Sequence, residues 1–251
     1  MRIRQLAGVA LFDWNRYSNA LRSRNPEWVG LCNRYEKLEA SPDGTGVKCD
    51  WRFTSELHAP KVVRGLGRRL MRRALSDYPI SLESSPRSSI VEGTPDVSFI
   101  IGHRGSQRLP HLLAVLQSIA AQCEARVECI VVEQSCAPEV DRQLPQWVRY
   151  VHTRLSDPEA LYSRSWAFNV GARLARGRLL VLQDNDLLVP REYASQLMAR
   201  YLQGFEVVNI KRFIFYLGQK ETQRLFSTGA RPIPAFSPEE VLQNAQGGGS
   251  I

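Results

Sequence analysis

The chain has 251 residues, a formal net charge of +8 at pH 7 and a hydrophobic fraction of 43%. This length allows one large domain or one domain with an appendage, and the apolar fraction is sufficient for a sizeable core. The positive charge favours an anionic partner, which could be a nucleic acid, a membrane surface or a phosphorylated small substrate.

Cysteine usage and hydropathy place the chain among proteins of a reducing compartment. The five cysteines include no Cys-x-x-Cys pair and the histidines are scattered, so a zinc motif is not expected. Free thiols are typical of a reducing environment. No run of about 20 apolar residues predicts a membrane span, and Asp13 and Asn15 interrupt the N-terminal apolar patch, which argues against a signal peptide. We expect a cytoplasmic location.

Residues 1–80 form an accessory segment whose apolar periodicity is too weak to name a fold. Its clearest element is a helix expected from Pro60 to Leu75, with one apolar side and one arginine-rich side. Residues 61–75 could make a peripheral contact with an anionic membrane, or the arginine face could be solvated and packed on the next domain. Residues 81–95 are rich in Ser, Pro and Gly, which predicts a linker before a domain at 96–251.

From Asp96 onward, strands and helices are expected to alternate. The apolar patterns predict strands at 97–101, 127–132, 147–151 and 179–182, with helices at 109–122, 162–175 and 190–203. Gly177 is expected to form a left-handed helix cap, and Gly204 to end the last of these helices. The 179–182 run has the pattern of a strand covered on both faces. This order predicts an α/β fold with a mainly parallel sheet and helices on both faces.

The pattern is less regular after this region. Residues 205–217 are expected to form a strand or hairpin arm. The sequence Ser-Pro-Glu-Glu at 237–240 matches a capping box and predicts the start of a helix.

Polar residues follow three of the predicted strands: His103 and Arg104, then Glu133, then Asp184 and Asp186. The carboxyl ends of parallel strands meet at one edge of a sheet, where ligands of such folds bind. Two carboxylates after a buried strand need a cation, solvent or hydrogen-bond donors. Mg²⁺ and Mn²⁺ take oxygen ligands, and Mg²⁺ usually binds one or two carboxylates together with substrate phosphates. The sequence therefore predicts a metal site at this edge, unless the aspartates simply form a solvated loop and helix cap.

Residues 96–217 resemble the GT-A fold of nucleotide-sugar glycosyltransferases, particularly family 2. The similar segments are the strand DVSFIIGHRG, the strand VECIVVEQS and the helix, strand and acidic triplet of NVGARLARGRLLVLQDNDLLVP. SRSWAFNVG is similar to the helix start of β-1,4-galactosyltransferases, and QGGGSI to their acceptor-side strand. The resemblance implies an inverting hexosyltransferase of polysaccharide biosynthesis. It would transfer sugar from a UDP-sugar to a saccharide acceptor with Mn²⁺ or Mg²⁺, without specific nucleic-acid binding.

The resemblance also implies a role for each matching residue. His103, Arg104 and Asn169 would lie at the donor, Glu133 at the ribose or uracil, and Arg164 near the base and diphosphate. Asp184 would face the ribose or a metal-bound water, and Asp186 would bind the metal. Gly248, Gly249 and Ser250 would lie on the acceptor side.

The segment that carries the family's catalytic base would follow Ile251, so we expect this chain to be a fragment of a longer enzyme. The alternatives are another base, or a nucleotide-sugar-binding module without turnover. A third alternative is a basic protein that binds a membrane surface or a nucleic acid. The absence of a Gly-x-Gly-x-x-Gly motif after the first strand disfavours a dehydrogenase.

Overall fold

The computed structural model describes residues 38–40, 47–49, 64–86, 93–208, 212–228 and 238–244, together with residues 3, 7, 10, 11, 14, 18, 21 and 22. The chain separates into two compact units. Unit 1 comprises residues 1–77, 203–224 and 234–251, and unit 2 comprises residues 78–202 and 225–233.

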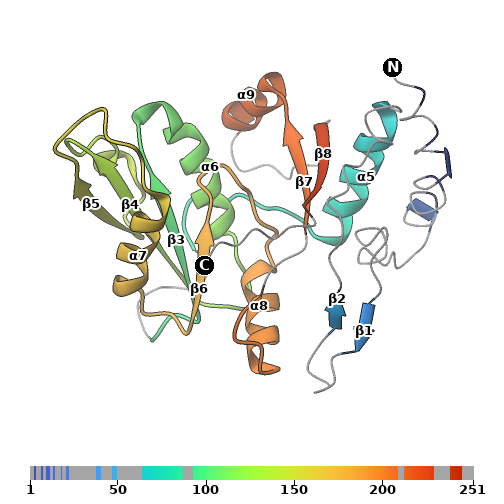
Figure 1. The fold of residues 1–251 in the computed structure, drawn as a ribbon, viewed down its shortest axis with the longest axis horizontal. Coiled ribbons are helices and arrows are strands. Elements are labelled where there is room, and N and C mark those ends of the chain that lie inside the picture. Colours follow the sequence, from blue (N-terminus) through green and yellow to red (C-terminus); the bar gives the residue numbers. More distant parts are fainter. Residues whose placement is uncertain are drawn as a thin grey trace. The chain divides into compact units, whose positions relative to one another are not determined.

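Unit 2 contains a four-stranded sheet in the order β5-β4-β3-β6 (Figure 1). Every neighbouring pair in this sheet is parallel. The strands are β3 (Val97–His103), β4 (Val127–Ser135), β5 (Val148–Arg154) and β6 (Leu179–Gln183). The expected α/β class with a mainly parallel sheet is confirmed, and the third predicted strand lies at an edge of the sheet.

Two helices connect strands of this sheet in opposite directions. Helix α6 (Leu109–Ala120), preceded by the 3-10 turn Ser106–Arg108, leads from β3 to β4. Helix α7 (Arg164–Leu174) leads from β5, past β4 and β3, to β6. Right-handed crossovers running in opposite directions place their helices on opposite faces of a sheet. The chain therefore reverses direction between β3 and β6, and this reversal is the topological switch point where open α/β sheets bind ligands.

The side chains of β3 and β4 alternate between two covered faces. Ile130 and Val132 pack with Ala167 of α7. Gly171 of α7 approaches Ile100 so closely that an added Cβ would collide with it. On the opposite face the Phe99 ring lies 6.2 Å from the ring of Tyr193, which begins helix α8 (Tyr193–Leu202). Burial on both faces explains the continuous apolar runs of these strands.

Strand β6 is covered on only one face, so the expectation of two-sided coverage is wrong. Leu180 and Leu182 are 44% and 49% exposed, whereas Val181 is buried. Leu182 is in register with Ile100, on the face that α7 covers at β3 and β4. Helix α7 packs on those two inner strands, and β6 at the edge of the sheet lies beyond its reach. An apolar run alone does not distinguish an edge strand from a central one.

The prediction that Gly177 forms a left-handed cap is also wrong. Helix α7 ends at Leu174 and the next residue, Ala175, has an extended conformation, whereas Gly177 is not among the glycines with positive φ. A Cβ at Gly177 would lie 2.7 Å from the Ser98 amide nitrogen and 2.9 Å from the Val97 carbonyl carbon. Glycine is needed here because the chain passes directly against the backbone of β3. Gly204 does have a positive φ of 93° after α8, as expected for a stop signal.

Unit 1 contains helix α5 (Arg64–Asp77) and two antiparallel strand pairs. The pairs are β1 (Leu38–Ala40) with β2 (Val47–Cys49), and β7 (Arg212–Leu217) with β8 (Pro238–Asn244). Strand β8 occupies the position where the capping box predicted a helix, so that prediction is wrong. Its pairing with β7, more than 20 residues earlier, is a long-range contact that a local motif does not report. A further helix, α9 (Gln219–Thr228), follows β7.

Helix α5 has a buried apolar side and an exposed basic side, as its sequence predicts. Leu66, Leu70 and Met71 are buried, whereas Arg69 and Arg72 are exposed. The helix packs against β8 within unit 1. None of the helices in the described part of the chain is long and apolar enough to span a bilayer.

Part of the predicted linker belongs to unit 2 and is packed within it. Leu82 is buried, and the Glu83 amide donates to the Gln117 carbonyl at 3.0 Å. The Trp147 indole nitrogen lies 3.3 Å from the Ser84 carbonyl oxygen.

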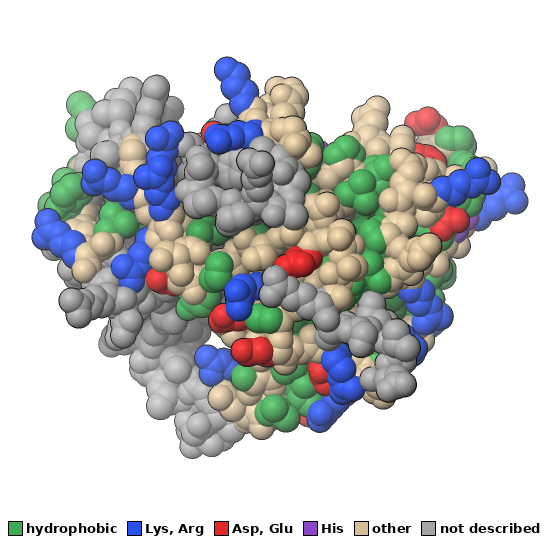
Figure 2. Space-filling view, turned by 180° about the vertical axis from the view of Figure 1, so that it is seen from behind, with side chains coloured by type: hydrophobic (Ala, Val, Ile, Leu, Met, Phe, Trp, Pro, Cys, Tyr) green, Lys and Arg blue, Asp and Glu red, His purple; other side chains and the backbone are tan. Residues whose placement is uncertain are grey.

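On the face shown in Figure 2, Lys and Arg side chains are distributed with Asp and Glu among them rather than gathered into one patch.

Candidate functional site

The switch point between β3 and β6 brings together two of the predicted clusters. His103 is the last residue of β3. The triplet Asp184-Asn185-Asp186 directly follows β6, the parallel neighbour of β3. On the other side of β3, His103 is in register with Glu133 of β4. Parallel register therefore places all three strand ends along one edge, as the sequence predicts.

Each aspartate of the triplet has an arginine partner. Asp184 Oδ1 lies 3.1 Å from Arg164 Nη1, and Asp186 Oδ2 lies 3.7 Å from Arg108 Nη1. Both arginine side chains are more than half exposed, so these ion pairs are screened by water and add little stability. The two pairs hold two carboxylates and two guanidinium groups at one open edge of the sheet.

The middle residue of the triplet points inward. Asn185 is buried, and its Nδ2 lies 3.2 Å from Nδ1 of His103. Its Oδ1 accepts a hydrogen bond of 3.4 Å from Arg108. Because the amide oxygen accepts from a guanidinium, the amide nitrogen is the donor toward His103, and the proton of the neutral imidazole belongs on Nε2. Asn185 thereby links the acidic loop, the end of β3 and Arg108.

His103 is fully buried, and its Nε2 has no hydrogen-bond partner in the described structure. Burial lowers the pKa of His103 below its usual value, although the nearby Glu133 carboxylate acts in the opposite direction. The ring is therefore neutral at physiological pH. An unpartnered polar atom in a buried position is a group whose partner can be supplied by a ligand.

Glu133 is fully buried and surrounded by donors of its own chain. Its carboxylate accepts from the hydroxyls of Ser135 and Tyr150 at 2.8 and 2.5 Å, and from the Glu139 amide at 3.0 Å. Burial, followed by the hydrogen bond to Glu133, raises the pKa of Tyr150. In this conformation Glu133 anchors the segment after β4. That Glu133 binds the ribose or uracil of a donor stays a prediction.

Arg164 is placed by the start of α7. The Ser163 hydroxyl caps the helix by accepting from the Trp166 amide at 3.4 Å. Gln134 at the end of β4 exchanges two hydrogen bonds with the Ser163 backbone, of 2.9 and 3.0 Å. The Arg164 guanidinium carbon also lies 5.3 Å from the centre of the Phe168 ring. Arg164 therefore reaches Asp184 from a helix that is fixed to the sheet.

The remaining predicted donor residues lie near this edge or on α7. Arg104 donates to the carbonyl oxygens of Ala160 and Pro158, both at 2.5 Å, so it fixes the loop after β5. Asn169 is exposed on α7. The acceptor-side residues Gly248, Gly249 and Ser250 lie outside the described residues. These assignments stay predictions.

Sequence reasoning missed three residues of this site: Arg108, Asn185 and Tyr162. Tyr162 lies over the end of β3, because a Cβ added to Gly102 would collide with its hydroxyl. Burial raises the pKa of Tyr162. In the sequence Asn185 stands between two aspartates, and only its inward orientation shows that it connects the elements. Arg108 was one arginine among many, and nothing local distinguishes it.

The donor set fits a divalent metal that shares its coordination with a bound ligand. Asp184 and Asp186 supply carboxylate oxygens at an open edge, and Mg²⁺ commonly takes only one or two carboxylates plus phosphate oxygens. The described residues contain no group of three or more His, Cys, Asp and Glu side chains able to enclose an ion. The residues therefore fit an ion that arrives with a phosphorylated ligand, and not a closed protein cage.

The doubly wound sheet, with an acidic pair and two arginines at its switch point, has the α/β organisation expected for GT-A nucleotide-sugar glycosyltransferases. The sequence model of glycosyl transferase family 2 matches residues 106–249, more than half of the chain. The chain therefore belongs to glycosyl transferase family 2.

A comparison with solved structures finds a mannosyltransferase, PcManGT from Pyrobaculum calidifontis, determined in complex with GDP-Man and Mn²⁺. The similarity has a TM-score of 0.32 and 14% sequence identity, and covers 66% of this chain and 48% of that chain. This chain thus spans about half the length of that enzyme. No curated protein matches the chain.

Proposed function

We propose that this protein is a metal-dependent glycosyltransferase that transfers a sugar from a UDP-sugar to a saccharide acceptor with inversion at the anomeric carbon. The observation that carries this proposal is the placement of Asp184 and Asp186 beside His103 at the switch point, each aspartate with an arginine partner. Family membership supports the reaction class.

The chemistry explains why both charge types are required. In the transfer, the acceptor hydroxyl oxygen bonds to the anomeric carbon while the bond to the diphosphate oxygen breaks. The electron pair leaves with the diphosphate, and the hydroxyl proton passes to a general base. Asp184 and Asp186 would hold a divalent metal, which would supply Lewis-acid stabilisation of that leaving group. Arg108 and Arg164 add permanent charge with a fork geometry suited to phosphate oxygens.

The ion pairs of the free protein prepare the site for this exchange. Without ligand, Arg164 and Arg108 balance the charges of Asp184 and Asp186. Asp184 and Asp186 would hold a divalent cation, and Arg108 and Arg164 would then pair with the diphosphate. Each of the four groups would keep a partner of opposite charge, so binding would leave no charge unpaired.

Calorimetry with UDP, with and without Mn²⁺, tests this assignment. We expect UDP to bind more tightly with Mn²⁺, and Asp186→Ala to weaken metal-stimulated binding at least about tenfold, because it removes a metal ligand. GDP serves as the comparison nucleotide. Asp141→Ala, at an exposed carboxylate in the 3-10 turn Asp141–Gln143, is the matched control and should bind like the wild type. Equal UDP affinity in Asp186→Ala with and without Mn²⁺ would overturn the site assignment.

A second part of the proposal concerns location. Cys123, Cys129 and Cys136 are free thiols among the described residues, which is consistent with a cytoplasmic protein. The basic helix predicted at residues 61–75 is the candidate for a peripheral membrane contact.

A further inference from the structure

Unit 1 contains a pocket that is lined largely by arginine. Its volume is about 530 Å³, within the range of pockets that bind small ligands. Eight residues line it: Trp14, Ser18, Leu21, Arg22, Leu66, Arg69, Arg72 and Arg73. Four of the eight are arginines and none is acidic, so the pocket is suited to an anion.

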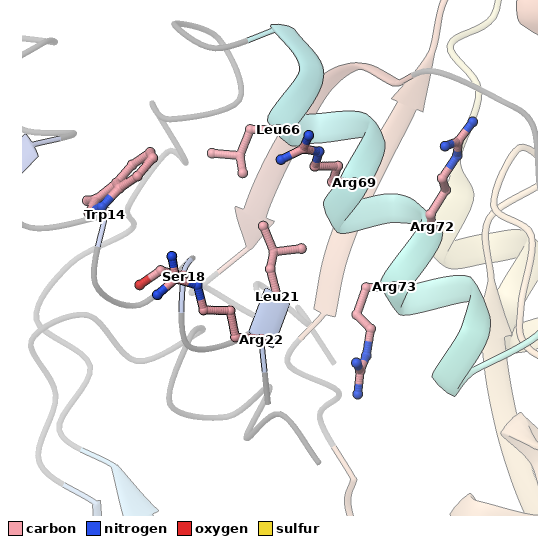
Figure 3. Close-up of a pocket in the computed structure, with 8 residues that line it drawn as sticks. All are labelled: Trp14, Ser18, Leu21, Arg22, Leu66, Arg69, Arg72 and Arg73. Atoms are coloured by element: carbon pink, nitrogen blue, oxygen red, sulfur yellow. The ribbon is translucent and has the colours of Figure 1, made fainter. Parts of the chain in front are cut away.

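The pocket has two walls from distant parts of the sequence. Figure 3 shows α5 supplying one wall and the N-terminal segment, including Trp14 and Arg22, supplying the other. The guanidinium groups of Arg22 and Arg69 lie on the Trp14 side of α5, whereas those of Arg72 and Arg73 lie farther along the helix (Figure 3). Two cationic groups from separate walls can therefore approach one ligand.

The charge in this pocket is not neutralised by the described part of the protein. Arg73 pairs with Asp77 at 3.2 Å, but Arg22, Arg69 and Arg72 have no ion-pair partner among the described residues. Arg69 and Arg72 are three positions apart on one helix, where like charges repel and destabilise the helix. An anionic ligand would remove this repulsion.

Unit 1 also exposes apolar side chains, which favour a lipid as the molecule that carries the anionic group. Ile3, Leu11 and Trp14 are 84%, 74% and 54% exposed. Exposed apolar residues with Trp, next to arginines, are typical of segments that lie in the interface of an anionic membrane.

We propose that unit 1 docks on an anionic membrane, with the pocket between Trp14 and α5 receiving a phosphate-bearing lipid headgroup. Arg22 and Arg69 bind the phosphate, Leu21 contacts the adjoining apolar part, and Ile3, Leu11 and Trp14 enter the lipid interface. The buried apolar side of α5 stays within the protein, so contact is made through its arginines and not by insertion of this helix.

Co-sedimentation with lipid vesicles tests this inference on the full chain. We expect binding to phosphatidylcholine vesicles that contain phosphatidylglycerol, and none to phosphatidylcholine alone. Arg22→Gln/Arg69→Gln should weaken binding about 30-fold, from the usual contribution of two arginines at an anionic surface. The exposed pair Arg142→Gln/Arg154→Gln has the same change in charge and should retain wild-type affinity. Arg22→Lys/Arg69→Lys keeps the charge and should still bind.

Several results would overturn the inference. One is equal binding to neutral and anionic vesicles. Another is an equal loss of vesicle affinity in Arg22→Gln/Arg69→Gln and Arg142→Gln/Arg154→Gln. A third is tighter binding to an oligonucleotide than to vesicles. Glycerol phosphate binding that depends on Arg22 and Arg69, without vesicle binding, would assign the pocket to a soluble phosphate and contradict membrane docking. Calorimetry with UDP and Mn²⁺ should be unchanged in Arg22→Gln/Arg69→Gln, which keeps this test separate from that of the donor site.

Discussion

Asn185 lies between two aspartates in sequence but performs a different task in the structure. Its side chain joins buried His103 to Arg108, and Arg108 in turn pairs with Asp186. The orientation of both Asp186 and its partner therefore depends on an amide that touches neither carboxylate. A residue of this kind positions the site rather than reacting in it.

Asn185→Leu keeps a similar volume but removes both hydrogen bonds. We expect a loss of about 1–3 kcal/mol in the free energy of unfolding, because buried His103 would then have both ring nitrogens unpaired. We also expect weaker UDP binding in the presence of Mn²⁺, with the metal dependence retained because both aspartates remain. Urea unfolding and calorimetry measure these two effects.

The control for this variant is Gln196→Leu, an amide-to-leucine change at an exposed position of α8. It should leave stability and binding unchanged. Wild-type stability and wild-type UDP affinity in Asn185→Leu would show that the amide bridge has no structural role. Complete loss of Mn²⁺ stimulation would instead identify Asn185 as a metal ligand, against its assignment as a positioning residue.

At the scale of elements, the turn from α7 to β6 determines where the acidic loop lies. The buried Glu128 carboxylate accepts from the Arg176 amide at 2.6 Å and from the Ser98 hydroxyl at 2.5 Å. The Gly177 amide donates to the Ser98 hydroxyl at 2.8 Å. Burial acts to raise the pKa of Glu128, but these donors outweigh it and the pKa is lowered. The start of β6 is thereby fixed to β3 and β4, and Asp184 follows its last residue.

Gly177→Ala tests this close approach. We expect destabilisation of about 1–3 kcal/mol, because the new methyl group would meet the backbone of β3, which cannot rotate away as a side chain can. Thermal unfolding measured by circular dichroism gives the size of the effect. Gly65→Ala is the contrasting variant, since nothing lies within 4 Å of its added Cβ. It should stabilise α5 by up to about 1 kcal/mol. Equal effects of the two substitutions would contradict the packing assigned to Gly177.

At the scale of the whole molecule, the regular part of the chain could be predicted because its local and long-range preferences agree. The alternation of apolar strands with helices predicts a parallel sheet, and parallel register predicts that residues at strand ends converge. This reasoning predicts that His103, Glu133 and Asp184 converge at one edge of the sheet, and the register of the strands places them there; their roles in binding a donor stay predictions.

The errors arose where a contact far away in sequence determines the local structure. The capping box at residues 237–240 could not report pairing with β7, and the apolar run of β6 could not report its edge position. Gly177 satisfied a rule for helix ends while being required for a close approach to β3. Arg108 and Asn185 were missed because their roles depend on partners about 80 residues apart.

The most direct test of the acidic pair is electron paramagnetic resonance of Mn²⁺ mixed with the protein and UDP. We expect the signal of the free ion to fall when protein is added and to fall further with UDP, because the diphosphate completes the coordination that Asp184 and Asp186 begin. The Asp184→Ala/Asp186→Ala double variant should leave the free-ion signal at the level seen with UDP alone. A signal that wild-type protein does not change in the presence of UDP, or that the double variant reduces equally, would contradict the metal site at the β3–β6 switch point.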